Sequence, residues 1–115
     1  MSDAKLKIRH AKRGNERTLD LSGLGLSELP VEITQLTMLE SINIENNKLT
    51  NLKRIEQLPN LREIKAANNM ITSLHQELLD MFSIESLSLY GNPIVNSAPQ
   101  LAQIENNQGM LKKAL

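Results

Sequence analysis

The sequence predicts an α/β solenoid, in which short parallel strands stack side by side and each strand is followed by a return segment. One observation behind this prediction is a repeated template, L-x-x-L-x-L-x-x-N-x-L, whose copies begin at positions 16, 39, 61 and 84. The nearly even periods of 23, 22 and 23 residues are typical of stacked repeats. The second observation is that apolar residues at the fourth and sixth places alternate with polar neighbours, which is the period of a strand with one buried face.

A helix is predicted over residues 2–13, before the first repeat. Ser2 can serve as its N-cap, and Gly14 with Asn15 supplies a stop. Its apolar face, expected to pack on the first repeat, consists of Ala4, Ile8 and Ala11. Its basic face consists of Lys5, Arg9, Lys12 and Arg13. We interpret the basic face as solvated, and keep contact with acidic protein, membrane or RNA as the alternative.

The first repeat is atypical, because Leu24 stands where the template has asparagine. Its return is expected to start a helix at Pro30, since proline suits a first helical turn. The second return, residues 50–60, is short, so we expect a 3-10 helix or a single helical turn there. In the third return Ser73 and Gln76 can form a capping box. We expect Phe82, which follows in the same return, to be part of the core.

The chain after the fourth repeat leaves the template. Ser97 and Gln100 read as a second capping box with Pro99 early in the helix. Asn106 to Gly109 should break that helix, and a last turn would contain Met110, Leu111, Lys112, Lys113 and Leu115. We therefore expect one domain, residues 1–115, with a helical cap at 1–15, four repeats at 16–96 and a helical cap at 97–115.

Each template asparagine follows a strand, where the chain must turn. An amide both donates and accepts hydrogen bonds, so it can satisfy backbone groups that the turn would bury unpaired. Spacing equal to the repeat favours this structural role over a metal or sugar site. The expected structural asparagines are Asn47, Asn69 and Asn92.

Residues 16 to about 95 resemble the leucine-rich repeat superfamily. The return L-P-V-E-I-T-Q-L at 29–36 resembles the L-P-x-x-I-x-x-L segment of intracellular signalling repeats. Segments 49–58 and 71–74 are similar to the 22-residue class of protein-phosphatase regulators, and G-N-P-I at 91–94 resembles the motif that closes a final repeat. The small Ala66 at a core place departs from the pattern.

This resemblance implies a right-handed solenoid with about four parallel strands on its concave side and helical or 3-10 returns on its convex side. It also implies binding of other proteins rather than catalysis. The leading hypothesis is a scaffold or regulatory subunit that docks a protein partner, such as a phosphatase, kinase or small GTPase, on the concave sheet face. The alternative is a structural repeat protein that assembles through its own ends or edges.

Strand residues that point away from the core are the candidate binding positions. The fifth places form one column and the seventh places another, and the latter includes Ala67 and the single tyrosine. Tyrosine is enriched in binding hot spots. The alternative is that these residues are simply solvated polar side chains without a role in binding. The candidate partner-binding residues are Asp20, Asn43, Glu45, Arg62, Lys65, Ser88 and Tyr90.

Composition argues against several other classes. Thirteen basic and thirteen acidic residues give no net charge, which disfavours nucleic acid, although residues 1–17 carry +4 and the remainder −4. Without cysteine there is no disulfide or Cys-based zinc site.

No catalytic or metal site is predicted. His10 and His75 are isolated from any nucleophile motif. His75, Glu77 and Asp80 are more readily explained as a solvated helix surface than as a metal site. Neither a signal peptide nor ~18 consecutive apolar residues is present, so no membrane span is predicted. We expect a cytoplasmic monomer without enzymatic activity or cofactor.

Overall fold

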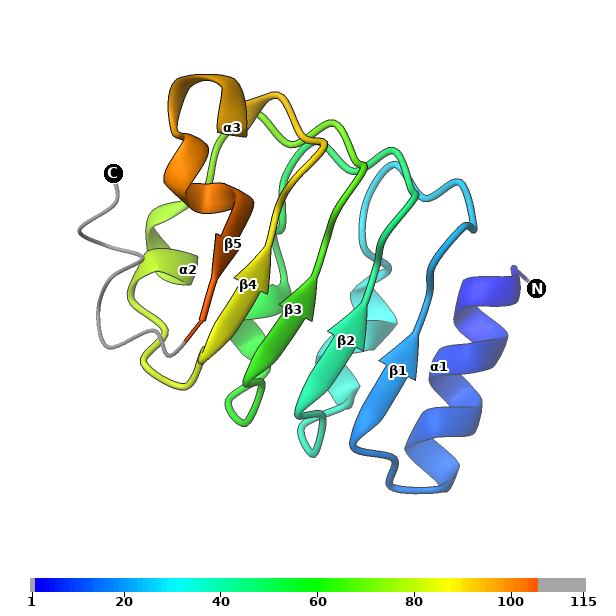
Figure 1. The fold of residues 1–115 in the computed structure, drawn as a ribbon. Coiled ribbons are helices and arrows are strands. Elements are labelled where there is room, and N and C mark those ends of the chain that lie inside the picture. Colours follow the sequence, from blue (N-terminus) through cyan, green and yellow to red (C-terminus); the bar gives the residue numbers. More distant parts are fainter. Residues whose placement is uncertain (1, 106–115) are drawn as a thin grey trace.

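Residues 2–105 are described by the computed structural model, and they stack into a solenoid with one continuous sheet (Figure 1). The sheet has the order β1-β2-β3-β4-β5, in which the first four strands are parallel and the fifth is antiparallel. The strands are β1 (Thr18–Asp20), β2 (Ser41–Asn43), β3 (Glu63–Lys65), β4 (Ser86–Ser88) and β5 (Gln103–Ile104). Equivalent places of consecutive repeats face each other, as Leu19, Ile42, Ile64 and Leu87 do.

Returns connect the strands behind the sheet in Figure 1. They contain the 3-10 helices η1 (Val31–Gln35) and η2 (Ile55–Gln57) and the short helix α2 (Gln76–Leu79). After β4 come α3 (Ile94–Ser97) and the 3-10 helix η3 (Pro99–Ala102). Each return buries at least one apolar side chain against the strand residues, so the core runs unbroken between sheet and returns. The return residues buried in this way include Ile33, Ile55, Leu78 and Ile94.

The N-terminal end of the core is covered by α1 (Asp3–Arg13). Ser2 is its N-cap and accepts the backbone N–H of Lys5, as the sequence predicts. The face that packs against the first repeat is the expected one, with Ala4, Ile8 and Ala11 buried. The apolar end of an open stack is thus shielded from water by a helix with one apolar face.

The C-terminal end differs from the expected helical cap. α3 ends at Ser97 rather than beginning there, and a 3-10 turn with Pro99 at its start leads into β5. Leu89 and Tyr90 both donate their backbone N–H to the carbonyl of Ala102, at 2.9 and 3.1 Å. The segment therefore covers the open edge of β4, whose backbone groups would otherwise lack partners. The expected helix break at Asn106 to Gly109 and the last turn at 110–115 lie outside the described residues.

Two expectations for the third return are wrong. α2 begins at Gln76 with His75 as its N-cap, and no side chain of a Ser73 capping box bonds to it. Phe82 is 89% exposed instead of lying in the core. The physical reason is that α2 ends after a single turn, and Leu78 fills the core place of this return.

The expected helix start at Pro30 in the first return is also wrong. Pro30 precedes η1 as its N-cap and is not part of a helix.

The buried asparagines join consecutive repeats. Asn69 donates from Nδ2 to the carbonyls of Ile44 and Ala66, both at 3.0 Å, and its Oδ1 accepts the N–H of Leu49 at 3.0 Å. Asn92 repeats this pattern one unit further along, with Ala66, Leu89 and Ile71. Asn47 bonds back to the first repeat through the carbonyl of Leu21 and the N–H groups of Leu24 and Leu26.

The eighth place of every repeat has a left-handed backbone, a feature that the sequence interpretation missed. The positive φ values are 67°, 58°, 58° and 78° at Gly23, Asn46, Asn68 and Gly91. Glycine and asparagine are the residues that adopt this conformation most readily. The occurrence of only glycine and asparagine at this place was the available signal.

Asn69→Ala should lower the free energy of unfolding by at least about 2 kcal/mol, because the buried backbone groups of two repeats lose their partners at roughly 1–3 kcal/mol each. Asn96→Ala is the control, since this asparagine is exposed on α3. Urea unfolding of both variants measures the difference. Equal stabilities would contradict the bridging role.

Gly91→Ala should destabilise the protein more than Gly23→Ala does. Both glycines have positive φ, so both substitutions strain the backbone by roughly 1–2 kcal/mol. At Gly91 an added Cβ would also lie 2.1 Å from Oδ1 of Asn68, whereas at Gly23 it would meet nothing within 4 Å. The difference between the melting temperatures of the two variants measures how much the contact with Asn68 adds to the destabilisation. A melting temperature of Gly91→Ala at or above that of Gly23→Ala would show that Asn68 moves aside freely.

Candidate functional site

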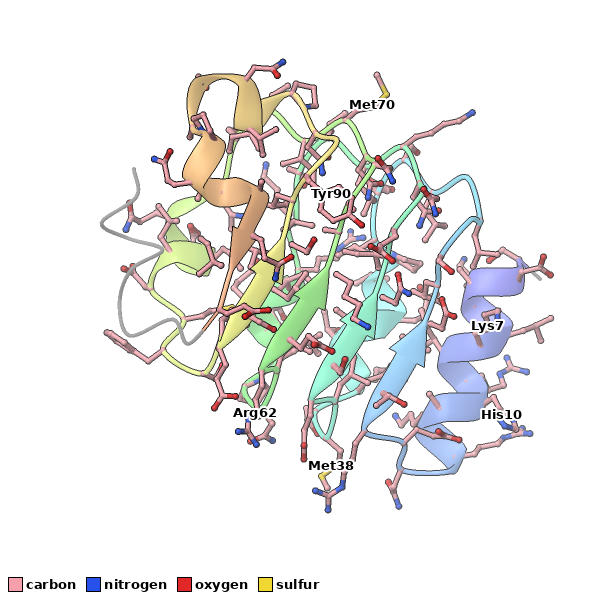
Figure 2. The ribbon with its side chains drawn as sticks, in the orientation of Figure 1. Lys7, His10, Met38, Arg62, Met70 and Tyr90 are labelled. Atoms are coloured by element: carbon pink, nitrogen blue, oxygen red, sulfur yellow. The ribbon has the colours of Figure 1, made fainter. Side chains whose placement is uncertain are left out.

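The outward face of the sheet displays two ranks of polar side chains that share a register (Figure 2). One rank runs through the third places, and the neighbouring rank runs through the fifth places. Inward residues between them, such as Ile42 and Leu87, are buried in the core. The third-place rank is Thr18, Ser41, Glu63 and Ser86, and the fifth-place rank is Asp20, Asn43, Lys65 and Ser88.

Two predicted site residues, Asp20 and Asn43, also stabilise their own strand ends. Asp20 Oδ1 accepts the backbone N–H and the hydroxyl of Ser22, at 2.9 and 2.7 Å. The hydroxyl of Ser22, its N–H, and the nearby Lys7 and Lys65 hold the pKa of the Asp20 carboxyl below its ordinary value. Asn43 Oδ1 accepts the N–H of Glu45 at 3.0 Å.

Charged pairs line the rim where the strands begin. Arg17 Nη1 lies 2.8 Å from Glu40 Oε2, and Arg62 Nη2 lies 2.7 Å from Glu85 Oε1. The hydrogen bond and charge of Glu85 raise the pKa of Arg62 further above its ordinary value. The predicted site residue Arg62 is therefore an exposed rim residue with a partner of its own. Exposed pairs of this kind contribute little to stability, so they remain available for contacts.

Ser88 and Ala67 are placed differently from the expected exposed columns. Ala67 is buried and offers no surface. Ser88 is only 7% exposed, because its cross-strand neighbours are the long side chains of Lys65 on one side and Gln103 on the other. Tyr90, by contrast, is 50% exposed at the end of β4. The Ser88 side chain therefore does not project from the sheet but lies at the bottom, between the longer side chains of Lys65 and Gln103.

A hollow of about 340 Å³ lies over β3, β4 and β5. It brings together Glu45, Lys65, Ser88 and Tyr90 among the predicted residues, and leaves Asp20, Asn43 and Arg62 outside. The candidate binding residues predicted from the sequence do not include its other lining residues. Glu63 was signalled by the third-place rank, whereas β5 gave no recognisable pattern. These additional residues are Glu63, Ile64, Ser86, Gln103 and Glu105.

A larger and more open hollow, about 570 Å³, lies between α1 and β1. Its lining includes Leu6, Lys7 and His10 from the helix and Asp20 from the strand. Figure 2 shows Lys7 and His10 on α1 at this end of the sheet. Two residues of the predicted basic face, Arg9 and Arg13, also line this hollow. The other two contact the first return, through the pairs Lys5–Glu32 at 3.7 Å and Lys12–Gln35 at 3.1 Å.

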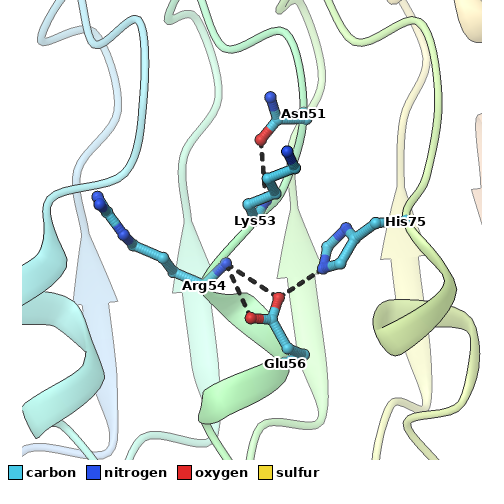
Figure 3. Close-up of polar contacts among 5 residues, drawn as sticks. All are labelled: Asn51, Lys53, Arg54, Glu56 and His75. Atoms are coloured by element: carbon cyan, nitrogen blue, oxygen red, sulfur yellow. Dashed lines mark hydrogen bonds and ion pairs between the residues drawn. The ribbon is translucent and has the colours of Figure 1, made fainter.

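A polar cluster joins the second and third returns on the opposite side (Figure 3). The Glu56 carboxylate accepts the backbone N–H of Arg54 at 2.9 Å and lies 2.5 Å from Nε2 of His75. Burial alone would raise the pKa of Glu56, but hydrogen bonds from His75 and from backbone N–H groups outweigh it, so the pKa lies below its ordinary value. His75 thus pairs with Glu56 of the preceding return. This contact links neighbouring repeats and contains no nucleophile.

Within residues 2–105, no helix combines the length and the apolar character that crossing a bilayer requires.

Glu56→Gln should lower the free energy of unfolding by roughly 1–2 kcal/mol at pH 7, because a charge-assisted contact between two returns is lost. A depressed carboxyl pKa contributes stability above the unfolded value of 4.5, and that contribution disappears as pH falls through the folded value. Urea unfolding at pH 7 and pH 3 should therefore show a difference that shrinks in acid. Glu77→Gln, an exposed carboxylate on α2, is the control. A difference that persists unchanged at pH 3 would contradict this assignment.

No family model matches the sequence. Toll-like receptor 2 of Macaca mulatta is 29% identical over 97 residues, which cover 84% of this chain and 12% of the receptor. Acidic leucine-rich nuclear phosphoprotein 32 family member A of Drosophila pseudoobscura pseudoobscura is 31% identical over 87 residues, 75% of this chain and 33% of that protein. A solved leucine-rich repeat protein of Leptospira interrogans superposes with a TM-score of 0.70 at 32% identity, over 94% of this chain and 26% of the other. The chain thus spans a third or less of each of these proteins. Together with the stacked parallel strands, these likenesses confirm the predicted fold class: the chain folds as an α/β leucine-rich repeat solenoid.

Proposed function

We propose that this protein is an interaction module that docks a protein partner on the outward face of its sheet. The observation that carries the proposal is the hollow over β3–β5, where a half-exposed tyrosine and several charged side chains surround a sunken floor. Because these side chains stand on strands whose backbones are fixed by the repeat stack, a partner would meet a rigid surface. Similarity to leucine-rich repeat proteins supports the same class of function.

The size of the sheet limits what such an interface contains. Four parallel strands at 4.7–4.9 Å spacing span only ~15 Å. A standard interface buries roughly 800 Å² on each partner, so contacts would extend beyond the strands. The charged rim around Arg62, next to β3, is an adjacent exposed surface that would extend the contact. We propose a regulatory or scaffold role in the cytoplasm, with a phosphatase, kinase or small GTPase as the class of partner.

Self-assembly is the second candidate, and the exposure of Phe82 favours it. An aromatic ring that is 89% exposed in the turn before β4 is an apolar surface that another copy could cover. The opposite charges of residues 1–17 and the remainder would also attract each other between copies. Light scattering of the wild type and Phe82→Ser over a range of concentrations separates the candidates. A wild type that stays monomeric at high concentration would eliminate self-assembly.

Exchanging side chains on the outward face should abolish partner capture without unfolding the protein. The double variant Tyr90→Ala and Glu45→Lys removes the hot-spot ring and reverses one charge of the hollow, and we expect at least a tenfold loss of specifically captured protein from a native lysate. Lys53→Glu is the matched control, because Lys53 is exposed on the opposite side. Thermal melting checks the fold of both variants. An unchanged set of captured proteins with an intact fold would refute docking on this face.

A further inference from the structure

The floor of the hollow over β3–β5 contains a polar atom that no hydrogen bond explains. Ser88 is 7% exposed, and its Oγ is buried without a hydrogen-bond partner in the described part of the chain. Ser88 lies on the outward face, because Leu87 beside it points into the core and Ser88 itself lines the hollow. A buried, unpaired hydroxyl is unfavourable. A ligand that entered the hollow could supply the missing partner.

The charges around this hydroxyl are mostly negative. Three carboxylates, those of Glu45, Glu63 and Glu105, line the hollow together with a single ammonium group, that of Lys65. Glu63 accepts the hydroxyl of Ser41 at 2.7 Å through one oxygen, which leaves the other oxygen able to accept from a ligand. The Coulomb field of this lining therefore favours a cation.

Tyr90 adds a second feature that suits a cation. Its ring is half exposed at the end of β4 and lines the same hollow as the carboxylates. A guanidinium or ammonium group placed over an aromatic face gains an additional attraction. The carboxylates, the serine hydroxyl and the ring together offer hydrogen-bond acceptors and a π surface to one positively charged group.

We propose that this hollow receives one basic side chain, arginine or lysine, projecting from the protein partner. The inference rests on the proposed docking of a partner on this face and specifies the chemistry of the contact. Arginine suits it best, because the guanidinium has five N–H donors and no acceptor. Its donors would bond to Ser88 Oγ and to the carboxylates of Glu45 and Glu63, while its plane lies against the Tyr90 ring.

A small-molecule or metal occupant suits the hollow less well. Its volume of about 340 Å³ is at the lower end of the roughly 300–1,000 Å³ range of small-molecule pockets. Such pockets are lined mainly by apolar side chains, whereas charged and polar residues dominate here. Among residues 2–105, no group of three His, Cys, Asp or Glu side chains is arranged to hold a metal ion. The charged and polar lining therefore suits a basic side chain better than an apolar small molecule.

Titration with N-acetyl-arginine amide, followed by the amide resonances of the ¹⁵N-labelled protein, tests the proposal. We expect roughly millimolar, salt-sensitive binding with the largest shifts at Ser88, Tyr90 and Glu105. N-acetyl-glutamine amide is the neutral control and should produce no saturable shift. Equal shifts with the glutamine probe, or arginine-dependent shifts only at other strands, would overturn the proposal. Putrescine tests free polyamines as the occupant, and tighter binding of putrescine than of the arginine probe would also overturn it.

Ser88→Ala separates a ligand-binding hydroxyl from a structural one. We expect the variant to bind the arginine probe about three- to tenfold more weakly while its melting temperature stays equal or rises, because an unpaired buried hydroxyl is removed. Ser73→Ala, an exposed serine of the third return that does not line the hollow, should change neither quantity. Glu45→Gln should weaken binding and reduce its salt dependence. A lower melting temperature for Ser88→Ala with unchanged probe affinity would assign Ser88 a structural role and overturn the proposal.

Failure of this inference is distinguishable from failure of the proposed function. If the Tyr90 and Glu45 double variant loses its captured partner but the arginine probe does not bind, docking stands and the basic contact is wrong. If neither partner capture nor probe binding depends on the sheet face, both are wrong.

Discussion

A buried side-chain amide that bonds to two repeats at once is the interaction on which the rest of the structure depends. The Nδ2 group of Asn69 donates to a carbonyl of its own repeat and to one of the preceding repeat, and its Oδ1 accepts an N–H from that preceding repeat. An aspartate would lack the donors, and a leucine would leave all these groups unpaired in the core. Since Asn47 and Asn92 make the same bonds, each repeat is placed on the one before it by the same geometry. The register of the strands, and hence the positions of Lys65 and Ser88, follow from it.

Each repeat needs a neighbour that covers its core and pairs its backbone groups, and this need explains both ends of the solenoid. The first repeat needs no amide because no strand precedes it, so Leu24 can occupy the template place while its N–H bonds to Asn47 of the next repeat. α1 replaces the missing neighbour with an apolar helical face. At the other end of the described residues, β5 pairs with β4 from the opposite direction. Within residues 2–105, α1 and the β5 segment bound four repeats, so these two segments contribute a large share of the core boundary.

Features encoded by local spacing could be predicted from the sequence. The strands, the α1 helix and the bridging asparagines all follow from a residue type at a fixed place, and the left-handed eighth place could have been added from its Gly and Asn residues. Phe82 could not be placed, because its exposure depends on α2 ending after one turn and on Leu78 occupying the core. Nor could β5, since its pairing uses backbone groups of residues that carry no repeat signature. The hollow depends on this β5 segment, as its wall includes Gln103 and Glu105.

The inward and outward residues of each strand have different roles, and this difference bears on function. Inward residues and amides fix the stack, so the outward residues can vary in charge and size with little effect on folding. Asp20 and Asn43 bond locally, to the residues two places further along the chain. Ser88 is the exception, because it is buried like a core residue yet has a hydroxyl without a partner. An alanine at this place would keep the backbone and remove the unpaired group. The stack therefore gives no structural reason for serine here, whereas the surrounding carboxylates give a chemical one.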